Sequence, residues 1–301
     1  MDLQKKKSFT SEYFMKVREI DESSGYQMTT SEANNAVEIL NDVRTKVKEN
    51  KSIMNPMQQI RFQESSFIQQ VHDFALLGLS LRDNDFYVDL RKHGYPQNGE
   101  MQQYDIGLWM QYQGEEKLLL RYCKKHGGIK TIKKDVVLKG EGVKIVNDML
   151  TGEKKITAHN YNPFDRKMDQ KNILGAYAQV YYKDGSIEAV MIGNDRIERA
   201  KKASAAGTKG PWGTDYAAMC EKTAVHVLYK NLKAYNVMND MTAKAVEQIE
   251  SHQSHEEEAI DAEDINVTVE NDQTVIDQET GEVIKNDGPF ENVSEDEEAP
   301  F

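Results

Sequence analysis

The chain of 301 residues is poor in cysteine and has no long apolar stretch. Its two cysteines are too few for a disulfide framework and suit a reducing compartment. No apolar run approaches the roughly 20 residues that a membrane-spanning helix requires, so we expect no membrane contact. Lys5, Lys6 and Lys7 have no apolar stretch behind them, which argues against a secretory signal. The length suits one large domain or two small ones, at about 100–200 residues per domain.

Recognisable catalytic signatures are also missing. No glycine-rich loop of the phosphate-binding or dinucleotide-binding kind is present, so we expect no use of ATP. Cys123 and His126 lie close together in the sequence, but no second pair completes a zinc site. Two acid-x-Lys tripeptides, beginning at Glu153 and Asp169, resemble an element of metal-dependent nucleases, although solvated turn charges explain them as well. We therefore expect no catalytic residue, no metal site and no cofactor, and a protein that is not an enzyme; a metal-dependent nuclease is kept as an alternative.

Positive charge is in deficit overall, but it is unevenly distributed. The formal net charge is −12, yet residues 241–301 hold 19 acidic and 2 basic side chains, and residues 1–240 hold 31 acidic and 36 basic ones. Residues 117–233 alone contain 23 basic and 12 acidic side chains. A basic body joined to an acidic tail is typical of nucleic-acid-binding proteins, although acidic tails also serve solubility alone.

Hydrophobic periodicity predicts an α+β fold, in which helices flank an antiparallel β-meander. Residues 1–28 show no clear period, and residues 239–301 are predicted to be a disordered acidic tail because apolar residues are sparse there. An Asp-Gly pair at Asp184 and Gly185 between two alternating runs indicates a tight hairpin. Helices are predicted over 30–49, 66–77, 115–125, 194–203 and 214–234, and strands over 86–90, 104–110, 136–139, 143–148, 155–159, 174–182 and 187–192.

Two neighbouring rows of basic residues form the candidate DNA-binding surface. One row lies in the predicted helix 194–203 and the small-residue run after it, and the other forms a stripe along the last predicted helix at spacings of three and four. Such rows can follow a phosphate backbone by replacing its counterions, although a single stripe is often only a solvated face. The candidate residues are Arg196, Arg199, Lys201, Lys202, Lys209, Lys222, His226, Lys230 and Lys233.

Aromatic residues are interleaved with these charges. Bases stack on aromatic rings without regard to sequence, as a general single-strand binder requires. Trp212 stands between Pro211 and Gly213, so it is the candidate for an exposed ring that touches a base or orders its loop. Most of the other rings are expected to pack in the core.

One block of sequence resembles the signature of the RecT family of phage single-strand annealing recombinases. The block runs from Gly210 to Tyr216 as Gly-Pro-Trp-Gly-Thr-Asp-Tyr, and Met219 and Glu221-Lys222-Thr223 follow it. The resemblance covers roughly residues 55–235. The supporting blocks are Gly175-Ala176-Tyr177-Ala178, Lys183-Asp184-Gly185, Arg196–Lys202, Leu77-Gly78-Leu79 and Tyr112-Gln113-Gly114.

The resemblance implies a RecT/Redβ-like annealing core and a division of the chain into three parts. Residues 1–54 would be a helical oligomerisation segment, 55–238 the DNA-binding and annealing core, and 239–301 the acidic tail. The implied protein coats single-stranded DNA without ATP, forms rings or helical filaments of itself and pairs complementary strands into duplex. The resemblance also implies a cytoplasmic location in a bacterial host and a 5′→3′ exonuclease as partner. Any magnesium dependence would act through the DNA. A passive single-strand-protecting protein is a further alternative.

The last residues resemble the C-terminal tip of bacterial single-stranded DNA-binding proteins. Acidic residues 295–298 are followed by Ala299, Pro300 and Phe301. Such tips dock into basic pockets of host repair partners. The resemblance therefore implies that the tail binds the host single-strand-binding protein or competes for the pockets of its partners. Alternatively, the tail folds back onto the protein's own DNA groove until DNA displaces it. A solubilising tail that ends in Pro-Phe by chance is the alternative.

Overall fold

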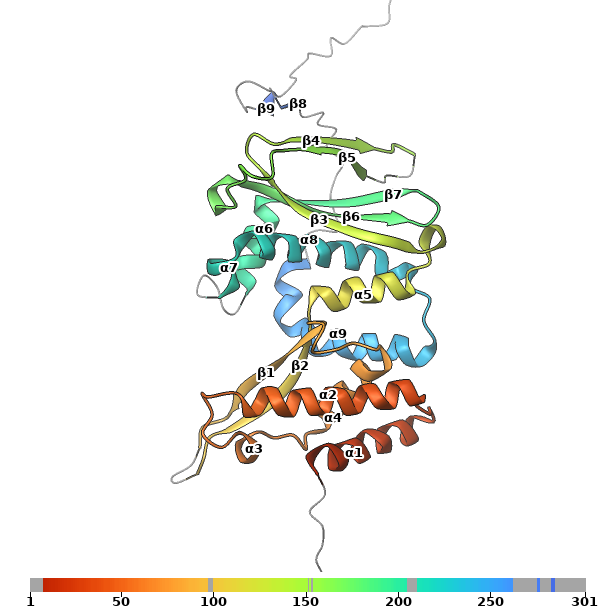
Figure 1. The fold of residues 1–301 in the computed structure, drawn as a ribbon, viewed down its shortest axis with the longest axis vertical. Helices are drawn as coiled ribbons and strands as arrows, with labels where there is room; N and C mark the ends of the chain where they lie inside the picture. Colours follow the sequence, from red (N-terminus) through yellow and green to blue (C-terminus); the bar gives the residue numbers. More distant parts are fainter. Residues whose placement is uncertain are drawn as a thin grey trace, which may run out of the picture.

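The computed structural model describes residues 8–96, 100–150, 152, 154–204 and 210–261, with the short strands β8 (Val275–Ile276) and β9 (Val283–Ile284). Side chains are described as far as residue 253. Lys209 and the Pro300-Phe301 tip lie outside the described residues. The described chain forms an elongated body, with the N-terminal elements at one end of the long axis and a sheet at the other (Figure 1).

The N-terminal part consists of four helices and a hairpin, and one of these helices is central. That helix, α4 (Ser65–Leu76), is buried over most of its length between α1, α2, β2 and α9. The predicted helix over 66–77 is confirmed, and Gly78, which follows it, takes a left-handed φ of 63°. The other elements of this part are α1 (Phe9–Ser24), α2 (Thr30–Lys48), α3 (Pro56–Gln59), β1 (Phe86–His93) and β2 (Gln103–Met110).

The start of α2 follows a local sequence signal, whereas α1 lacks one. The predicted helix at 30–49 is confirmed, but its cap is Thr29, whose side chain and Glu32 form a reciprocal capping box. Helix α1 has no clear apolar period because one of its three buried positions is acidic. Tyr13, Val17 and Asp21 lie on its inner face at spacings of four.

The C-terminal part is a three-stranded antiparallel sheet backed by helices. Its strands run in the order β3 (Ile129–Leu138), β6 (Ile173–Tyr182), β7 (Ile187–Gly193), and all pairs are antiparallel. The predicted Asp184-Gly185 hairpin is confirmed, with Gly185 at a φ of 90°. A second hairpin, β4 (Gly142–Asn147) with β5 (Lys154–Asn160), is inserted between β3 and β6 and forms a sheet of its own. The α+β class is therefore confirmed, with the antiparallel strands divided among separate sheets.

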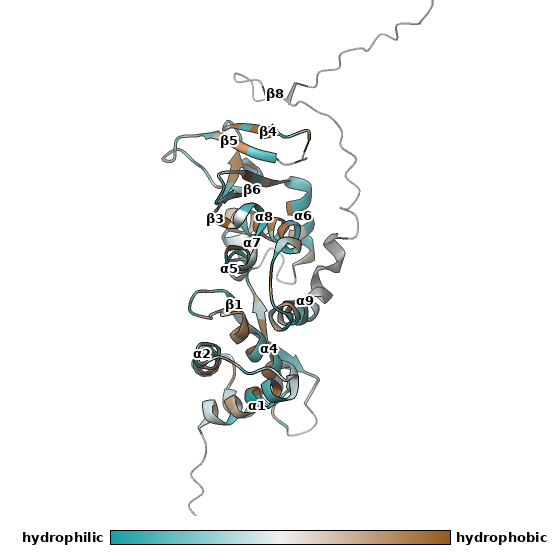
Figure 2. Ribbon diagram, turned by 90° about the vertical axis from the view of Figure 1, so that its right-hand side faces the viewer, coloured by the Kyte–Doolittle hydropathy of each residue, from teal (hydrophilic) through white to brown (hydrophobic). Residues whose placement is uncertain are grey.

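Helices cover one face of this sheet. α8 (Tyr216–Leu232) packs against β3, β6 and β7, and α5 (Tyr112–Tyr122) packs against α8 and β3 (Figures 1 and 2). Asp215 caps α8 by accepting a hydrogen bond from the Ala218 N–H, so the helix predicted over 214–234 begins at Tyr216. The remaining short elements are η1 (Lys125–Gly127), η2 (Gln170–Asn172), α6 (Asn194–Ala203), α7 (Pro211–Thr214) and η4 (Lys233–Tyr235).

The boundary predicted at residues 238/239 is wrong. Residues Asp240–Asp261 form the helix α9, which packs against α4 and α6. Ala245 and Ile249 are fully buried there, and Thr242 is buried with them. Small and single apolar residues spaced by three and four are enough to hold this helix on the core, although acidic residues surround them. Among the described residues, no helix is long and apolar enough to cross a membrane.

Candidate nucleic-acid interface

The predicted basic stripe on α8 does not form one continuous surface. Lys222 is exposed, but His226 donates a hydrogen bond from Nδ1 to Glu115 of α5, at 2.5 Å. Lys230 is half-buried, and the Lys233 ammonium pairs with Glu250 of α9 at 2.8 Å. The stripe is divided in this way because α8 is enclosed by the sheet, α5 and α9. Lys222, at the N-terminal end of the stripe, is exposed, and Lys233 at the other end is exposed but paired with an acidic side chain.

The predicted row on α6 lies at the edge of the sheet. Lys202 is exposed, whereas Arg196 and Arg199 are half-buried. The Lys201 ammonium lies 5.3 Å from the ring centre of Tyr216 and donates a hydrogen bond of 3.4 Å to Gln170 in η2. Lys201 is thereby held beside the loop that leads into β6.

Trp212 is not an exposed ring, which corrects the prediction of base contact. Its side chain is 3 % exposed, and the ring meets Tyr216 edge-on at 5.6 Å. The flanking Gly and Pro residues build the short helix α7, which folds the indole against α8. Trp212 therefore orders its segment, the other role that the sequence suggested.

A groove that the sequence reasoning missed lies on the opposite face of the sheet from α8. It has a volume of about 570 Å³ and runs between β3, β6 and β5. Alternate residues of β6 form its floor, and this period of two is the signal that could have found it. Its polar and aromatic lining comprises Lys133, Lys134, Asp135, Thr157, His159, Tyr161, Tyr177, Gln179 and Tyr181. We call it the sheet groove.

The floor of the sheet groove combines a cation with an aromatic ring. Lys133 is exposed, and its ammonium lies 5.3 Å from the ring centre of Tyr181. Within the described part of the chain, no carboxylate pairs with Lys133. Gln179 orients the ring because its side chain donates to the Tyr181 hydroxyl at 2.8 Å and accepts from the Ile156 N–H at 2.7 Å. An exposed ammonium beside a half-buried ring can contact both a phosphate and a base.

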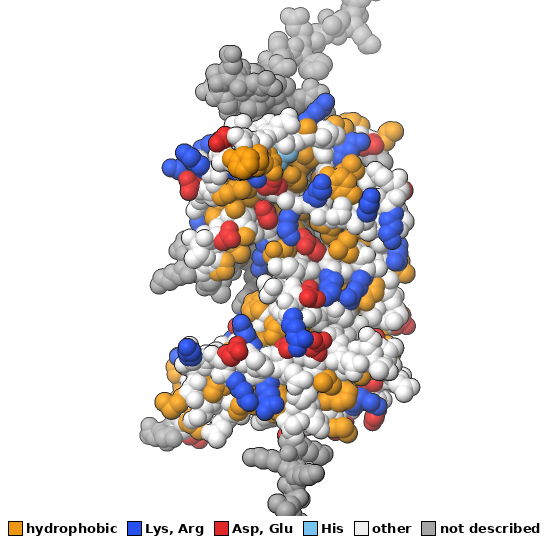
Figure 3. Space-filling view, in the orientation of Figure 1, with side chains coloured by type: hydrophobic (Ala, Val, Ile, Leu, Met, Phe, Trp, Pro, Cys, Tyr) orange, Lys and Arg blue, Asp and Glu red, His pale blue; other side chains and the backbone are white. Residues whose placement is uncertain are grey.

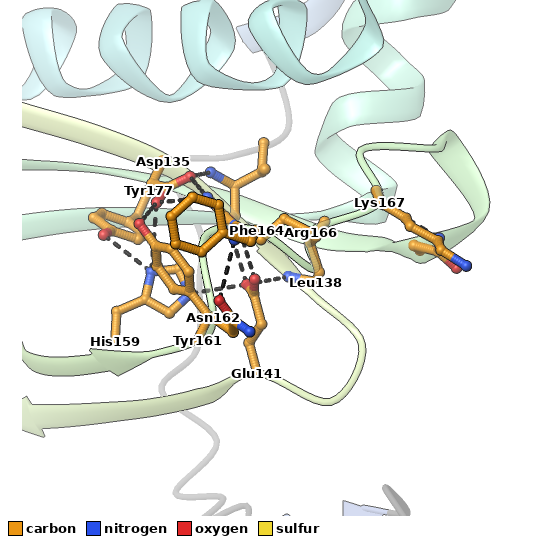
Figure 4. A network of polar contacts seen from close by, with 12 residues as sticks. Asp135, Leu138, Glu141, His159, Tyr161, Asn162, Phe164, Arg166, Lys167 and Tyr177 are labelled. Carbon is orange, nitrogen blue, oxygen red and sulfur yellow. Dashed lines mark hydrogen bonds and ion pairs between the residues drawn. The ribbon is translucent and has the colours of Figure 1, made fainter.

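A buried polar network closes one end of the sheet groove (Figure 4). Arg166 lies at its centre: Nε donates to Glu141 at 2.7 Å, Nη1 to Asp135 at 2.9 Å and Nη2 to the Val136 carbonyl at 2.7 Å. Its guanidinium also stacks on the Tyr161 ring at 3.9 Å. The network therefore fixes the loop 161–169 against β3.

Histidine and tyrosine extend this network to β5 and β6. His159 donates from Nε2 to Glu141 at 2.9 Å, and its Nδ1 accepts from the Tyr177 hydroxyl at 3.2 Å. Burial and then the Asp135 carboxylate raise the pKa of Tyr177 to about 12, so the hydroxyl keeps its proton. The strand β5 is thereby attached to the sheet on which it lies.

Arg166 keeps Glu141 ionised and pairs with Asp135 as well. Burial alone would raise the pKa of Glu141, but the hydrogen bonds from Arg166 and from the Leu138 N–H outweigh it and lower the pKa. Among the described residues, no group of three or more His, Cys, Asp and Glu side chains is placed to hold a metal ion. The network is therefore suited to positioning the rim of the groove, and its two carboxylates share the one positive charge of Arg166.

A basic track continues from the sheet groove toward α6. A smaller hollow of about 320 Å³ adjoins the groove, and Tyr161 lines both. Lys139 and Lys167 line this hollow and are exposed. Lys171 follows in η2, beside the Gln170 that holds Lys201. On the face drawn in Figure 3, Lys and Arg side chains are interspersed with acidic and apolar ones over the sheet end of the molecule.

The structure is that of an α+β protein with a basic track beside its sheet, and the sequence comparison identifies its family. The RecT family model matches residues 38–263, well over half of the chain. The chain therefore belongs to the RecT family, whose members anneal single-stranded DNA in recombination. No curated protein matches the chain. The match runs from α2 to the end of α9, so α9 belongs to the family core and not to the tail.

One family block has a direct structural reason. At Gly175, in the block Gly175-Ala176-Tyr177-Ala178, an added Cβ would collide with the Ile192 carbonyl oxygen of β7. Glycine is required because β6 and β7 approach closely there. The same block places Tyr177 in the sheet groove and Ala176 and Ala178 in the core beneath it.

Proposed function

We propose that this protein binds single-stranded DNA along the sheet groove and the basic track, and anneals complementary strands without ATP. Its membership of the RecT family carries the annealing part of the proposal. The arrangement of Lys133 over Tyr181 supports the location, because it offers backbone and stacking contacts that read no sequence. Annealing needs such contacts, since the base edges must stay free to test the incoming strand.

The experiment that tests the proposal mixes two complementary oligonucleotides, each already coated with protein. An annealing protein speeds duplex formation, measured by fluorescence energy transfer between dyes on the two strands, and the rate is the same with and without ATP. A passive single-strand protector slows duplex formation. A metal-dependent nuclease produces shortened strands on a denaturing gel when Mg²⁺ is added.

A pair of variants locates the site. Tyr181→Ala removes the ring and is expected to cost about 1–3 kcal/mol of binding per stacked base, which is roughly 5- to 150-fold in Kd. Tyr181→Phe keeps the ring, loses only the Gln179 hydrogen bond and is expected to bind nearly as tightly. Equal binding by all three proteins, measured by fluorescence anisotropy, would remove the ring from the site.

The proposal extends to partners. A 5′→3′ exonuclease would supply the single strands, copies of the chain would assemble along them in rings or helical filaments, and any effect of Mg²⁺ would come through screening of the DNA. The Pro300-Phe301 tip would bind a host repair partner through a basic pocket. Deleting these two residues should weaken capture of that partner and leave annealing of bare oligonucleotides unchanged; unchanged capture contradicts a docking role.

A further inference from the structure

An aromatic ring projects into solvent from the loop that follows β5. Phe164 is 94 % exposed, although its side chain has no polar group that favours contact with water. Single exposed apolar side chains are common on protein surfaces. Phe164, however, lies in the loop that the buried network of Figure 4 fixes against β3. An apolar ring held in place on a rigid support is suited to contact with a ligand.

The turn that carries the ring is held by its own hydrogen bonds. The Phe164 N–H donates to the side-chain oxygen of Asn162 at 3.2 Å, and the Asp165 N–H donates to the Asn162 carbonyl at 3.1 Å. The Asn162 amide also donates to the Asp165 carboxylate. Pro163 restricts the backbone further because its ring fixes φ. The backbone beneath the phenyl ring is therefore ordered before a ligand binds, which lowers the entropy cost of binding.

Arg166 attaches this turn to the sheet two residues after the ring. Its side chain is nearly buried and pairs with Asp135 of β3 and with Glu141. Its Nη2 also donates to the Val136 carbonyl at 2.7 Å. Because the ring is so close in sequence to this anchor, it keeps its place beside β3 while its surface stays accessible.

The ring stands where the sheet groove passes into the basic track. Asn162 and Asp165, on either side of it in the sequence, line the smaller hollow, and Tyr161 lines both the hollow and the groove. Lys139 and Lys167 also line the hollow, and both are exposed. Exposed ammonium groups can hold phosphates while a neighbouring ring receives a base.

We propose that Phe164 stacks on a base of the bound single strand and interrupts the stacking of that base on its neighbour. Apolar side chains such as phenylalanine unstack nucleic acids in this way when they insert between successive bases. A phenyl ring forms no hydrogen bond to a base edge, so it accepts any base and reads no sequence. The inference rests on the proposed function, because it requires that single-stranded DNA follows the sheet groove and the basic track.

A tryptophan reporter at this position tests the contact in the full-length protein. Stacking on a base quenches indole fluorescence, so the emission of Phe164→Trp should fall as a poly-dT oligonucleotide is added. Tyr95→Trp is the matched control, because Tyr95 is 98 % exposed in the β1–β2 connection, at the N-terminal end of the body (Figure 1). Trp109 and Trp212 are present in both variants, so the signal of the unaltered protein is subtracted from each.

Removal of the ring provides a second measurement. Phe164→Ala is expected to weaken oligonucleotide binding by about 5- to 150-fold in Kd, which corresponds to the loss of one stacked base. Its unfolding temperature should equal that of the unaltered protein, because an exposed ring contributes little to the core. A lower affinity at equal stability would therefore come from a lost contact with DNA.

Fluorescence anisotropy of a labelled oligonucleotide separates this inference from the proposed function. A protein that does not bind the oligonucleotide contradicts the proposed function, and the stacking contact with it. Three results contradict the stacking contact alone, in a protein that does bind. These are unquenched emission from Phe164→Trp, equal quenching of Tyr95→Trp, and an unchanged Kd in Phe164→Ala.

Discussion

Arg166 offers the sharpest test of how the rim of the sheet groove is held. Its side chain is nearly buried and lies between two carboxylates, at 2.9 Å from Asp135 and 2.7 Å from Glu141. Arg166→Ala leaves both acids near one another without a cation. Removing one partner of a buried ion pair costs about 3–5 kcal/mol. At roughly 2–4 °C per kcal/mol for a domain of about this size, the unfolding temperature should fall by roughly 6–20 °C.

The pH dependence of this loss identifies its cause. In the unaltered protein the pKa of Glu141 is lowered from 4.5, so its contribution to stability is present above that pH and is lost as the pH falls through the folded value. In Arg166→Ala the acids have no cation and gain from protonation. The stability difference between the two proteins should therefore shrink below about pH 4.5.

Thermal unfolding followed by far-UV circular dichroism, from pH 3.5 to 7.5, measures this difference. Arg166→Lys is the matched control, because it keeps the charge and loses the planar two-sided contact, so we expect an intermediate unfolding temperature. An Arg166→Ala protein that unfolds within about 1 kcal/mol of the unaltered protein at neutral pH would refute the reasoning.

Two further predictions concern the corrected residues. Trp212→Ala should cost about 3–5 kcal/mol of folding stability because the indole is buried. Trp212→Phe should leave the oligonucleotide affinity unchanged. A large loss of affinity in Trp212→Phe would show that the indole ring contacts a base. Ending the chain after residue 261 should leave the unfolding temperature unchanged, while ending it after residue 239 removes Ala245 and Ile249 from the core and should lower it. Equal unfolding temperatures for the two truncations would contradict the packing of α9.

Local pattern was sufficient where one element supplies its own signal. The helices α2 and α4 were predicted from apolar residues at spacings of three and four, and the β6–β7 hairpin from Asp184-Gly185. Helix α1 was missed because its third buried position is Asp21, which interrupts the apolar period. Helix α9 was missed because few apolar residues, such as Ile249, hold it in an acidic stretch.

The candidate site depended on tertiary contacts that periodicity does not contain. His226 and Lys233 lie on one side of α8, as their spacing predicts. Glu115 of α5 and Glu250 of α9 pack on that side and pair with them. The sheet groove combines residues of β3, β5, β6 and a loop, which are far apart in the sequence. The sequence alone shows only that Tyr177, Gln179 and Tyr181 alternate along β6 and so share one face of the strand.

The salt dependence of single-strand binding tests the central claim, that DNA lies along the sheet groove. The measurement is the slope of log Kobs against log salt concentration for an oligonucleotide, compared between Lys133→Gln and Lys233→Gln. Each phosphate contact on a single strand contributes about 0.7 to this slope. The account predicts that Lys133→Gln flattens the slope by about 0.7, and that Lys233→Gln leaves it unchanged because Lys233 pairs with Glu250 on the other side of the sheet. An unchanged slope in Lys133→Gln together with a flattened slope in Lys233→Gln would place the DNA on the α8 stripe and contradict the account.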